Sequence, residues 1–105
     1  MDKIWLKNYP TGVPAEINPN EYRSLVEILE ESCQRFHDLP AFTSMDKTIS
    51  YAEYDRLSGA FAAWLQSHAK LQKGDRIAIM LPNVLQYPIA LFGALRAGLT
   101  VVNTN

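Results

Sequence analysis

The chain has 105 residues, enough for about one small domain, with 10 Lys and Arg residues set against 11 Asp and Glu residues. The resulting net charge of −1 offers no polyanion-binding surface, so nucleic acid is excluded as a partner on electrostatic grounds. Hydrophobic residues make up 48% of the sequence, which is ordinary for a globular core and too high for a disordered chain.

Residues 1–21 are predicted to form an extended arm. Pro10, Pro14 and Pro19 interrupt this stretch, and no helical or strand periodicity runs through it. It also holds more apolar residues than a tail exposed to water needs, so we expect a strap that lies across a larger body. The opening MDKIWLKNYP lacks the continuous apolar segment of a signal peptide.

A first amphipathic helix is predicted from Ser24 to about His37. Ser24 and Glu27 have capping-box spacing, and Leu39-Pro40 follows the expected end. The apolar stripe consists of Leu25, Ile28, Leu29, Ser32, Cys33 and Phe36. Cys33 is the only cysteine, so it cannot form an internal disulfide, and we expect a buried, unreactive thiol in a reducing cytoplasmic setting.

A hairpin and a second helix are predicted next. The runs 41–44 and 48–50 flank a turn at Asp46-Lys47, which is typical of a short hairpin. Ser50 and Glu53 form another capping-box pattern, and the helix that they begin should end before Lys73-Gly74. Its apolar stripe is expected at Leu57, Phe61, Trp64 or Leu65, and His68 or Ala69.

The longest uncharged stretch, between Arg76 and Arg96, is long enough for a bilayer span, for which about 18 apolar residues suffice. Pro82 and Asn83 break it, and lipid would leave their polar groups unsatisfied. We predict instead a strand at 76–81, a helix at 84–97 capped by Asn83 and Gln86, and a parallel strand at 100–103. Strands of a parallel sheet are buried on both faces, which explains why the stretch between Arg76 and Arg96 carries no charged residue.

Two details of this predicted βαβ unit concern the ends of its helix. Pro88 is expected to kink or loosen the first turn, and Gly98 to stop the helix after Arg96, whose charge suits the negative helix end.

No constellation of residues in the sequence predicts a catalytic or binding site. Gly93 and Gly98 have phosphate-loop spacing, but Leu99-Thr100 stands where lysine and a hydroxyl residue are needed. Cys33 could act as a nucleophile with His37 as its base, but the sequence indicates no third group to orient the histidine. His68 is isolated, and Glu27, Glu30 and Glu31 are interpreted as a solvated helix face.

Three stretches of the sequence carry a family resemblance. The opening IWLKNYPTGVPAEINPNEYRSLVEILEESCQRF resembles the leader of bacterial long-chain fatty-acid–CoA ligases, a branch of the adenylate-forming (AMP-binding) superfamily. ISYAEYDRLSGAFAAWLQ is similar to the first core motif, Leu-Thr/Ser-Tyr-x-Glu-Leu, with Ile49 and Tyr54 in place of its leucines. The second core motif, Leu-Lys-Ala-Gly, is matched by residues 95–98, with Arg96 in place of lysine.

The resemblance implies an α/β chain that forms the N-terminal piece of the large adenylation domain, with residues 22–105 belonging to that domain and 1–21 preceding it as the arm. It also implies a parent enzyme that uses ATP, Mg²⁺, a long-chain fatty acid and coenzyme A, in the cytoplasm or peripheral to the inner membrane. The superfamily's phosphate loop, Thr-Glu pair, ribose-binding Asp and catalytic Lys have no counterpart positions in the sequence. We therefore assign no catalytic, cofactor-binding or metal-binding residue, and expect none of these ligands to bind the chain alone.

Two alternatives to the ligase interpretation have less support in the sequence. A self-contained α/β binding or scaffolding module fits the length, but it would expose much of a parallel sheet built to be covered. An independent thiol enzyme would need more than Cys33. Because the arm and the sheet edge carry apolar surface suited to the remainder of an adenylation domain, the isolated chain is expected to self-associate.

Overall fold

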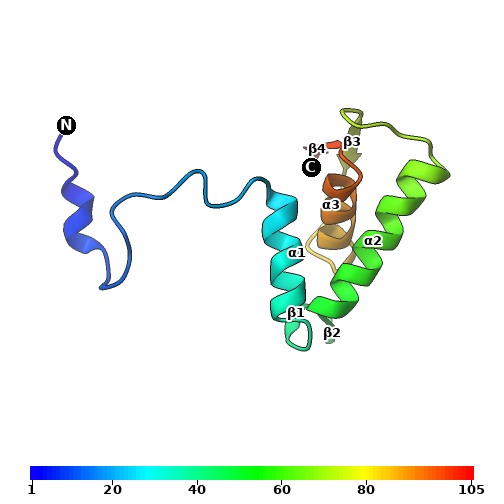
Figure 1. Ribbon diagram of the computed structural model, residues 1–105. Helices are drawn as coiled ribbons and strands as arrows, with labels where there is room; N and C mark the ends of the chain where they lie inside the picture. The colour runs from blue at the N-terminus through cyan, green and yellow to red at the C-terminus, as the bar shows by residue number, and fades with distance from the viewer.

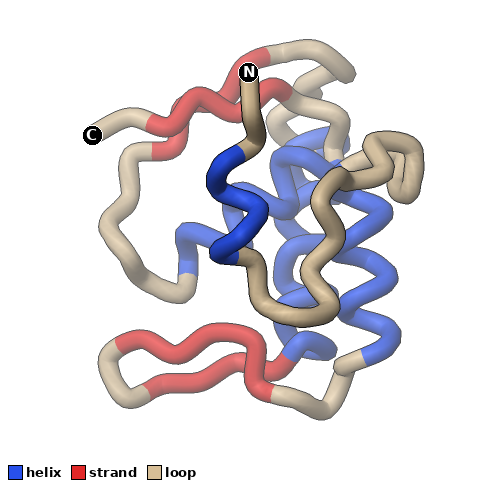
Figure 2. Tube along the Cα trace, turned by 90° about the vertical axis from the view of Figure 1, so that its left-hand side faces the viewer, coloured by secondary structure: helices blue, strands red, loops and turns tan.

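The computed structural model describes all residues, 1–105, as an α/β arrangement with one 3-10 helix, three α-helices and two small sheets (Figure 1). In chain order the elements are η1 (Ile4–Asn8), α1 (Leu25–Arg35), β1 (Pro40–Ser44), β2 (Lys47–Ser50), α2 (Tyr51–Ser67), β3 (Arg76–Ile79), α3 (Gln86–Arg96) and β4 (Thr100–Asn103). The hairpin β1–β2 and the parallel pair β3–β4 lie at opposite ends of the helices (Figures 1 and 2).

The first two α-helices begin where their capping residues predict. The Ser24 hydroxyl accepts a hydrogen bond from the Glu27 amide at 3.1 Å, and the Ser50 hydroxyl accepts one from the Glu53 amide at 3.1 Å. The Glu27 carboxylate also accepts a bond from the Arg23 amide, at 2.6 Å. Each cap satisfies helix-end amides that would otherwise lack a partner, which confirms both predicted starts.

The hairpin is confirmed, and its turn has a defined conformation. Met45 and Asp46 both have positive φ, at 51° and 63°, which carries the chain from β1 directly into the antiparallel strand β2. The Thr43 and Thr48 hydroxyls, on paired residues, lie 2.7 Å apart across the strands.

The uncharged stretch divides into strand, loop, helix and strand. β3 and β4 are parallel, with Ile77 opposite Val101 and Ile79 opposite Asn103. Gly98, with φ of 81°, follows the end of α3 as predicted. No helix of the chain combines the length and the apolar character that a membrane crossing would need.

The predicted start of α3 is wrong by about two residues. The chain bends through Asn83 and Val84, and the residue that precedes the helix is Leu85, which makes no side-chain cap. Asn83 and Gln86 therefore form no capping box. With the helix starting at Gln86, Pro88 falls in the first turn, where its missing amide hydrogen costs no intrahelical bond.

Two apolar clusters fill the space between the helices and the sheets. One, at the parallel pair, consists of Ala62, Leu65, Ala94, Ala97 and Leu99; the other, at the hairpin, consists of Cys33, Ile49, Tyr54 and Phe92. The predicted stripes need correction, since Leu25 and Trp64 are mostly or half exposed, while the inward face of α2 carries Tyr54 and Ser58.

The N-terminal arm projects away from the helices (Figure 1), and in the rotated view it passes in front of them (Figure 2). Its residues 4–8 form a 3-10 helix that the sequence analysis did not predict, and its one ion pair, Lys3–Glu16 at 2.7 Å, lies within the arm. Ile4 and Ile17 are largely exposed. η1 contacts no other helix or strand of the chain.

Candidate functional site

Cys33 is buried, with 2% of its surface exposed, as predicted. Burial raises the pKa of its thiol, and so do the negative charges of Asp55 and Glu30, while Arg96 opposes them. The thiol is therefore protonated at neutral pH, a poor state for nucleophilic attack. His37 lies beyond the end of α1, and its Nδ1 is 2.7 Å from the Asp38 carboxylate, so the two candidate groups are not brought together.

The remaining candidate residues also have structural partners. His68 stacks on Trp64, with ring centroids 5.4 Å apart. A Cβ atom at Gly93 would lie 2.9 Å from the Ser58 carbonyl oxygen, so this glycine permits the close crossing of α2 and α3. No group of three His, Cys, Asp or Glu side chains is arranged to hold a metal ion.

The most connected polar side chain is Arg96, near the C-terminal end of α3. Its Nη1 donates to the Asp55 carbonyl oxygen at 2.9 Å, lies 2.8 Å from the Asp55 carboxylate and donates to the Ser58 hydroxyl at 3.2 Å. Its Nε lies 3.4 Å from the Glu30 carboxylate, and its guanidinium lies 5.0 Å from the centre of the Phe92 ring. One side chain thus joins α1, α2 and α3.

The sequence did not predict this junction, because Arg96 is explained there by the helix dipole alone and Glu30 by a solvated helix face. The available signal was the spacing of Phe92 and Arg96, four residues apart on an otherwise apolar helix. That spacing places the guanidinium on the inward face, where only 21% of the side chain remains exposed. A cation held there needs carboxylate partners from neighbouring elements.

Ser58, on the inward face of α2, also takes part in this junction. It is fully buried, and its hydroxyl donates to the Tyr54 carbonyl oxygen at 2.7 Å while accepting from Arg96. No buried side-chain nitrogen or oxygen in the molecule lacks a partner. The buried polar atoms of the junction are therefore all paired within the protein, which indicates a structural role.

An apolar hollow of about 430 Å³ lies between the hairpin and the start of α3. It is bounded by Leu29, Phe42, Tyr54, Leu85, Pro88 and Leu91, with Ser44 and Asn83 at polar positions. The Tyr54 hydroxyl donates to the Pro88 carbonyl oxygen at 3.2 Å, and the Ser44 hydroxyl donates to the Asn83 carbonyl oxygen at 3.3 Å. Both hydroxyls therefore fix the walls of the hollow.

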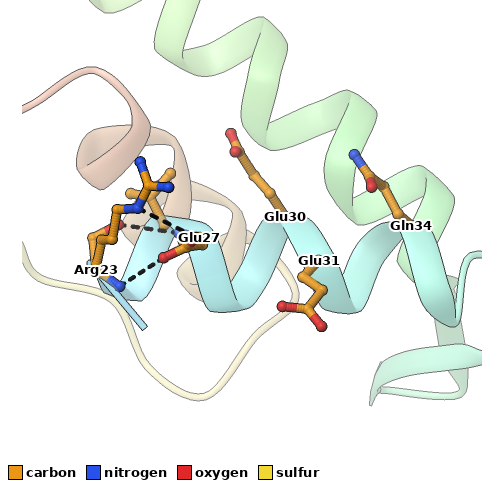
Figure 3. Close-up of a pocket in the computed structure, with 7 residues that line it drawn as sticks. Arg23, Glu27, Glu30, Glu31 and Gln34 are labelled. Atoms are coloured by element: carbon orange, nitrogen blue, oxygen red, sulfur yellow. Dashed lines mark hydrogen bonds and ion pairs between the residues drawn. The ribbon is translucent and has the colours of Figure 1, made fainter. Parts of the chain in front are cut away.

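A second, open hollow runs along α1 and is rimmed by acidic side chains (Figure 3). Glu27 is engaged in the helix cap with Arg23, and Glu30 and Glu31 point away from each other. These carboxylates do not converge on a common point, so they do not form a cation site.

A comparison with family models identifies the chain. Residues 29–105, most of its length, match the model described as AMP-binding enzyme. The chain belongs to the AMP-binding enzyme family. The Ser50–Glu53 cap and the Gly98 turn, which lie in the stretches that resemble core motifs of the superfamily, have structural roles in this chain.

Curated relatives match over the whole chain. It is 55% identical over 105 residues to a long-chain-fatty-acid–CoA ligase of Yersinia pestis and 46% identical to one of Haemophilus influenzae. These alignments cover 100% of this chain and 19% of each relative. The chain thus spans about a fifth of the length of the curated relatives that it matches.

Two solved structures share the fold of the chain. The N-terminal subdomain of Klebsiella oxytoca NpsA aligns with a TM-score of 0.76 and 30% identity, covering 80% of this chain and 22% of that one. VinN aligns with a TM-score of 0.73 and 31% identity, covering 77% of this chain and 21% of that one. These matches confirm the predicted fold class, an α/β piece of an adenylation domain.

Proposed function

We propose that this chain is part of an ATP-dependent long-chain fatty-acid–CoA ligase. The observation that carries the proposal is the 55% identity to such a ligase across all 105 residues. This similarity includes the N-terminal arm, which precedes the residues matched by the family model. An arm shared with a fatty-acid–CoA ligase favours that branch over other adenylate-forming enzymes.

The proposed reaction has two steps. A fatty carboxylate attacks the α-phosphorus of ATP and releases pyrophosphate, which gives an acyl-adenylate. The thiol of coenzyme A then attacks the acyl carbon and releases AMP, which gives the thioester. The first step turns a carboxylate oxygen into part of a good leaving group, and Mg²⁺ would stabilise the charge on the phosphates.

The role that we propose for residues 22–105 is architectural. They supply two parallel strands, their covering helices and a hairpin to the adenylation domain, while residues 1–21 form a strap against the remainder of that protein. The Arg96 guanidinium, on the inward face of α3, already pairs with the Asp55 carboxylate and the Ser58 hydroxyl. We therefore propose that the groups that bind ATP, Mg²⁺ and coenzyme A lie elsewhere in the enzyme, which would act in the cytoplasm or peripheral to the inner membrane.

A chimeric ligase tests this proposal directly. The 105 matching residues of the Yersinia pestis relative would be replaced by this chain, and palmitate-dependent ATP–pyrophosphate exchange and acyl-CoA formation would be measured. The unmodified relative and the isolated 105-residue chain serve as controls, and circular dichroism and gel filtration establish that each protein is folded.

We expect exchange and thioester formation by the chimera and neither reaction by the isolated chain. Exchange by the purified chain alone would contradict the architectural role. A folded chimera that neither exchanges pyrophosphate nor forms acyl-CoA would contradict the assignment to the ligase.

A further inference from the structure

Helix α1 is attached to the rest of the molecule by a small number of interactions. Cys33 is its only buried side chain, and Val26 and Leu29 add partly buried contacts with the hairpin cluster. By contrast, α2 and α3 each bury several residues. An element with so little buried surface opens at a lower free energy than the core elements.

The polar attachment of α1 is a single ion pair. The hydrogen bonds made by Glu27 and Ser32 stay within the helix or its cap, and only Glu30 reaches another helix, through Arg96. The Glu30 side chain is 46% exposed, so its carboxylate is largely solvated already. An ion pair with one partner this exposed contributes little to stability, so its separation costs little free energy.

Arg96 stays paired when Glu30 leaves. Its Nη1 keeps the Asp55 carboxylate at 2.8 Å, the Asp55 carbonyl oxygen at 2.9 Å and the Ser58 hydroxyl at 3.2 Å, all of which belong to α2. Removing one partner of a buried pair is costly chiefly when it strands the other charge. Here no charge is stranded, because α2 retains the guanidinium.

Two backbone hydrogen bonds just after the C-terminal end of α1 define where a hinge would lie. The Tyr51 amide donates to the Leu39 carbonyl oxygen at 3.0 Å, and the Ala52 amide donates to the His37 carbonyl oxygen at 2.9 Å. These bonds fix residues 37–39 to the first turn of α2. Movement of α1 therefore begins at Phe36, while the hairpin and α2 keep their positions.

We propose that α1, together with the N-terminal arm, is a detachable unit that is latched by Glu30 and Arg96. It opens about the hinge while α2, α3 and both strand pairs stay folded. Opening removes Leu29 from the wall of the apolar hollow and uncovers Tyr54, Phe92 and the Cys33 thiol.

The thiol of Cys33 reports this motion, because it is the only cysteine and lies on the face of α1 that is buried against Ile49, Tyr54 and Phe92. Labelling by a maleimide would be followed at constant pH in the 105-residue chain, in Glu30→Gln and in Glu31→Gln. Glu31 lies on the same helix, is exposed and forms no ion pair, so its substitution is the matched control. The midpoint of urea unfolding is measured in parallel by circular dichroism.

We expect Glu30→Gln to speed labelling by about two- to five-fold, as for the loss of a partly exposed ion pair, and Glu31→Gln to leave it unchanged. Raising the salt concentration from about 0.05 to about 1 M should speed labelling of the unmodified chain and have no effect on Glu30→Gln. Labelling should depend weakly on urea below the unfolding transition.

The proposal is overturned if labelling shows the full urea dependence of global unfolding, since Cys33 would then be exposed only when the whole chain unfolds. It is also overturned if Glu30→Gln and Glu31→Gln give the same labelling rate, because Glu30 would then hold no latch.

Discussion

Because α2 and α3 cross closely at Gly93, we predict that adding a single methyl group there destabilises the fold. In Gly93→Ala, the new Cβ would lie 2.8 Å from the Phe61 Cδ1 atom and 2.9 Å from the Ser58 carbonyl oxygen. The second contact is with the backbone of a neighbouring helix, which cannot rotate away. Overpacking of this kind costs about 1–3 kcal/mol.

Helix propensity acts in the opposite direction. Replacing glycine by alanine inside a helix stabilises it by about 0.8–1.0 kcal/mol. Because two contacts fall below 3.0 Å, we place the packing cost in the upper half of its range, so the net effect is a loss of about 1–2 kcal/mol in the free energy of unfolding.

Gly59→Ala is the matched control, since Gly59 is likewise a glycine inside a helix, α2, and faces the Arg96 junction. Its added Cβ would meet only the Arg96 side chain, with Nη1 at 3.2 Å and Cζ at 3.8 Å, so a shift of a few tenths of an ångström in the guanidinium suffices. The propensity gain should therefore prevail, and this variant should be as stable as the unmodified chain or more stable by up to about 1 kcal/mol.

Urea unfolding followed by circular dichroism measures both variants. With a slope of about 1–3 kcal/mol per molar urea, the midpoint of Gly93→Ala should fall by roughly 0.3–2 M while that of Gly59→Ala stays or rises. A higher midpoint for Gly93→Ala than for the unmodified chain would refute the close approach of the two helices.

Three further predictions concern the junction, the titrating groups and the exposed surface. Arg96→Lys replaces a fork by a point charge and should lower the free energy of unfolding by about 1 kcal/mol; a double-mutant cycle with Asp55→Asn measures the coupling, and zero coupling would contradict the pairing. Burial raises the pKa of Cys33 and Tyr54, so both groups favour the fold while protonated. Stability should therefore be complete below their ordinary pKa values and fall as the pH rises through the raised ones; urea midpoints from pH 7 to about 11 test this, and a constant midpoint would exclude it. The isolated chain should self-associate through its arm and open strand edges, so light scattering should show a mass that rises with concentration rather than a monomer throughout.

Local signals in the sequence predicted the local structure well. Ser24 and Ser50 each bind an amide three residues away, so a pattern within one turn is enough to place the start of the helix. Asn83 has the same type of side chain, but the chain bends after Pro82 and the helix begins only at Gln86. Whether a candidate cap is used depends on the backbone path that precedes it, which tertiary packing decides.

The junction at Arg96 could not be predicted in this way, because its partners come from distant parts of the chain. Asp55 is 41 positions away in the sequence, and Glu30 is on a third helix. No periodicity within one helix shows which acidic residue will face a given cation. The burial of Ser58 was missed for a different reason: a serine on an amphipathic helix is ordinarily placed on the solvent side.

The position of this junction along the helices has a consequence for how α2 and α3 align. On α2, Ser58 lies between Tyr54 of the hairpin cluster and Ala62 of the other cluster, so a polar layer separates two apolar ones. Sliding α3 by one turn would carry the guanidinium among apolar side chains and leave it without a carboxylate. Apolar layers alone tolerate such a slip, whereas a buried polar layer permits only one alignment, as a single asparagine does in a coiled coil. Substitutions among the apolar residues can therefore accumulate on either side of Ser58 while the helices keep their register.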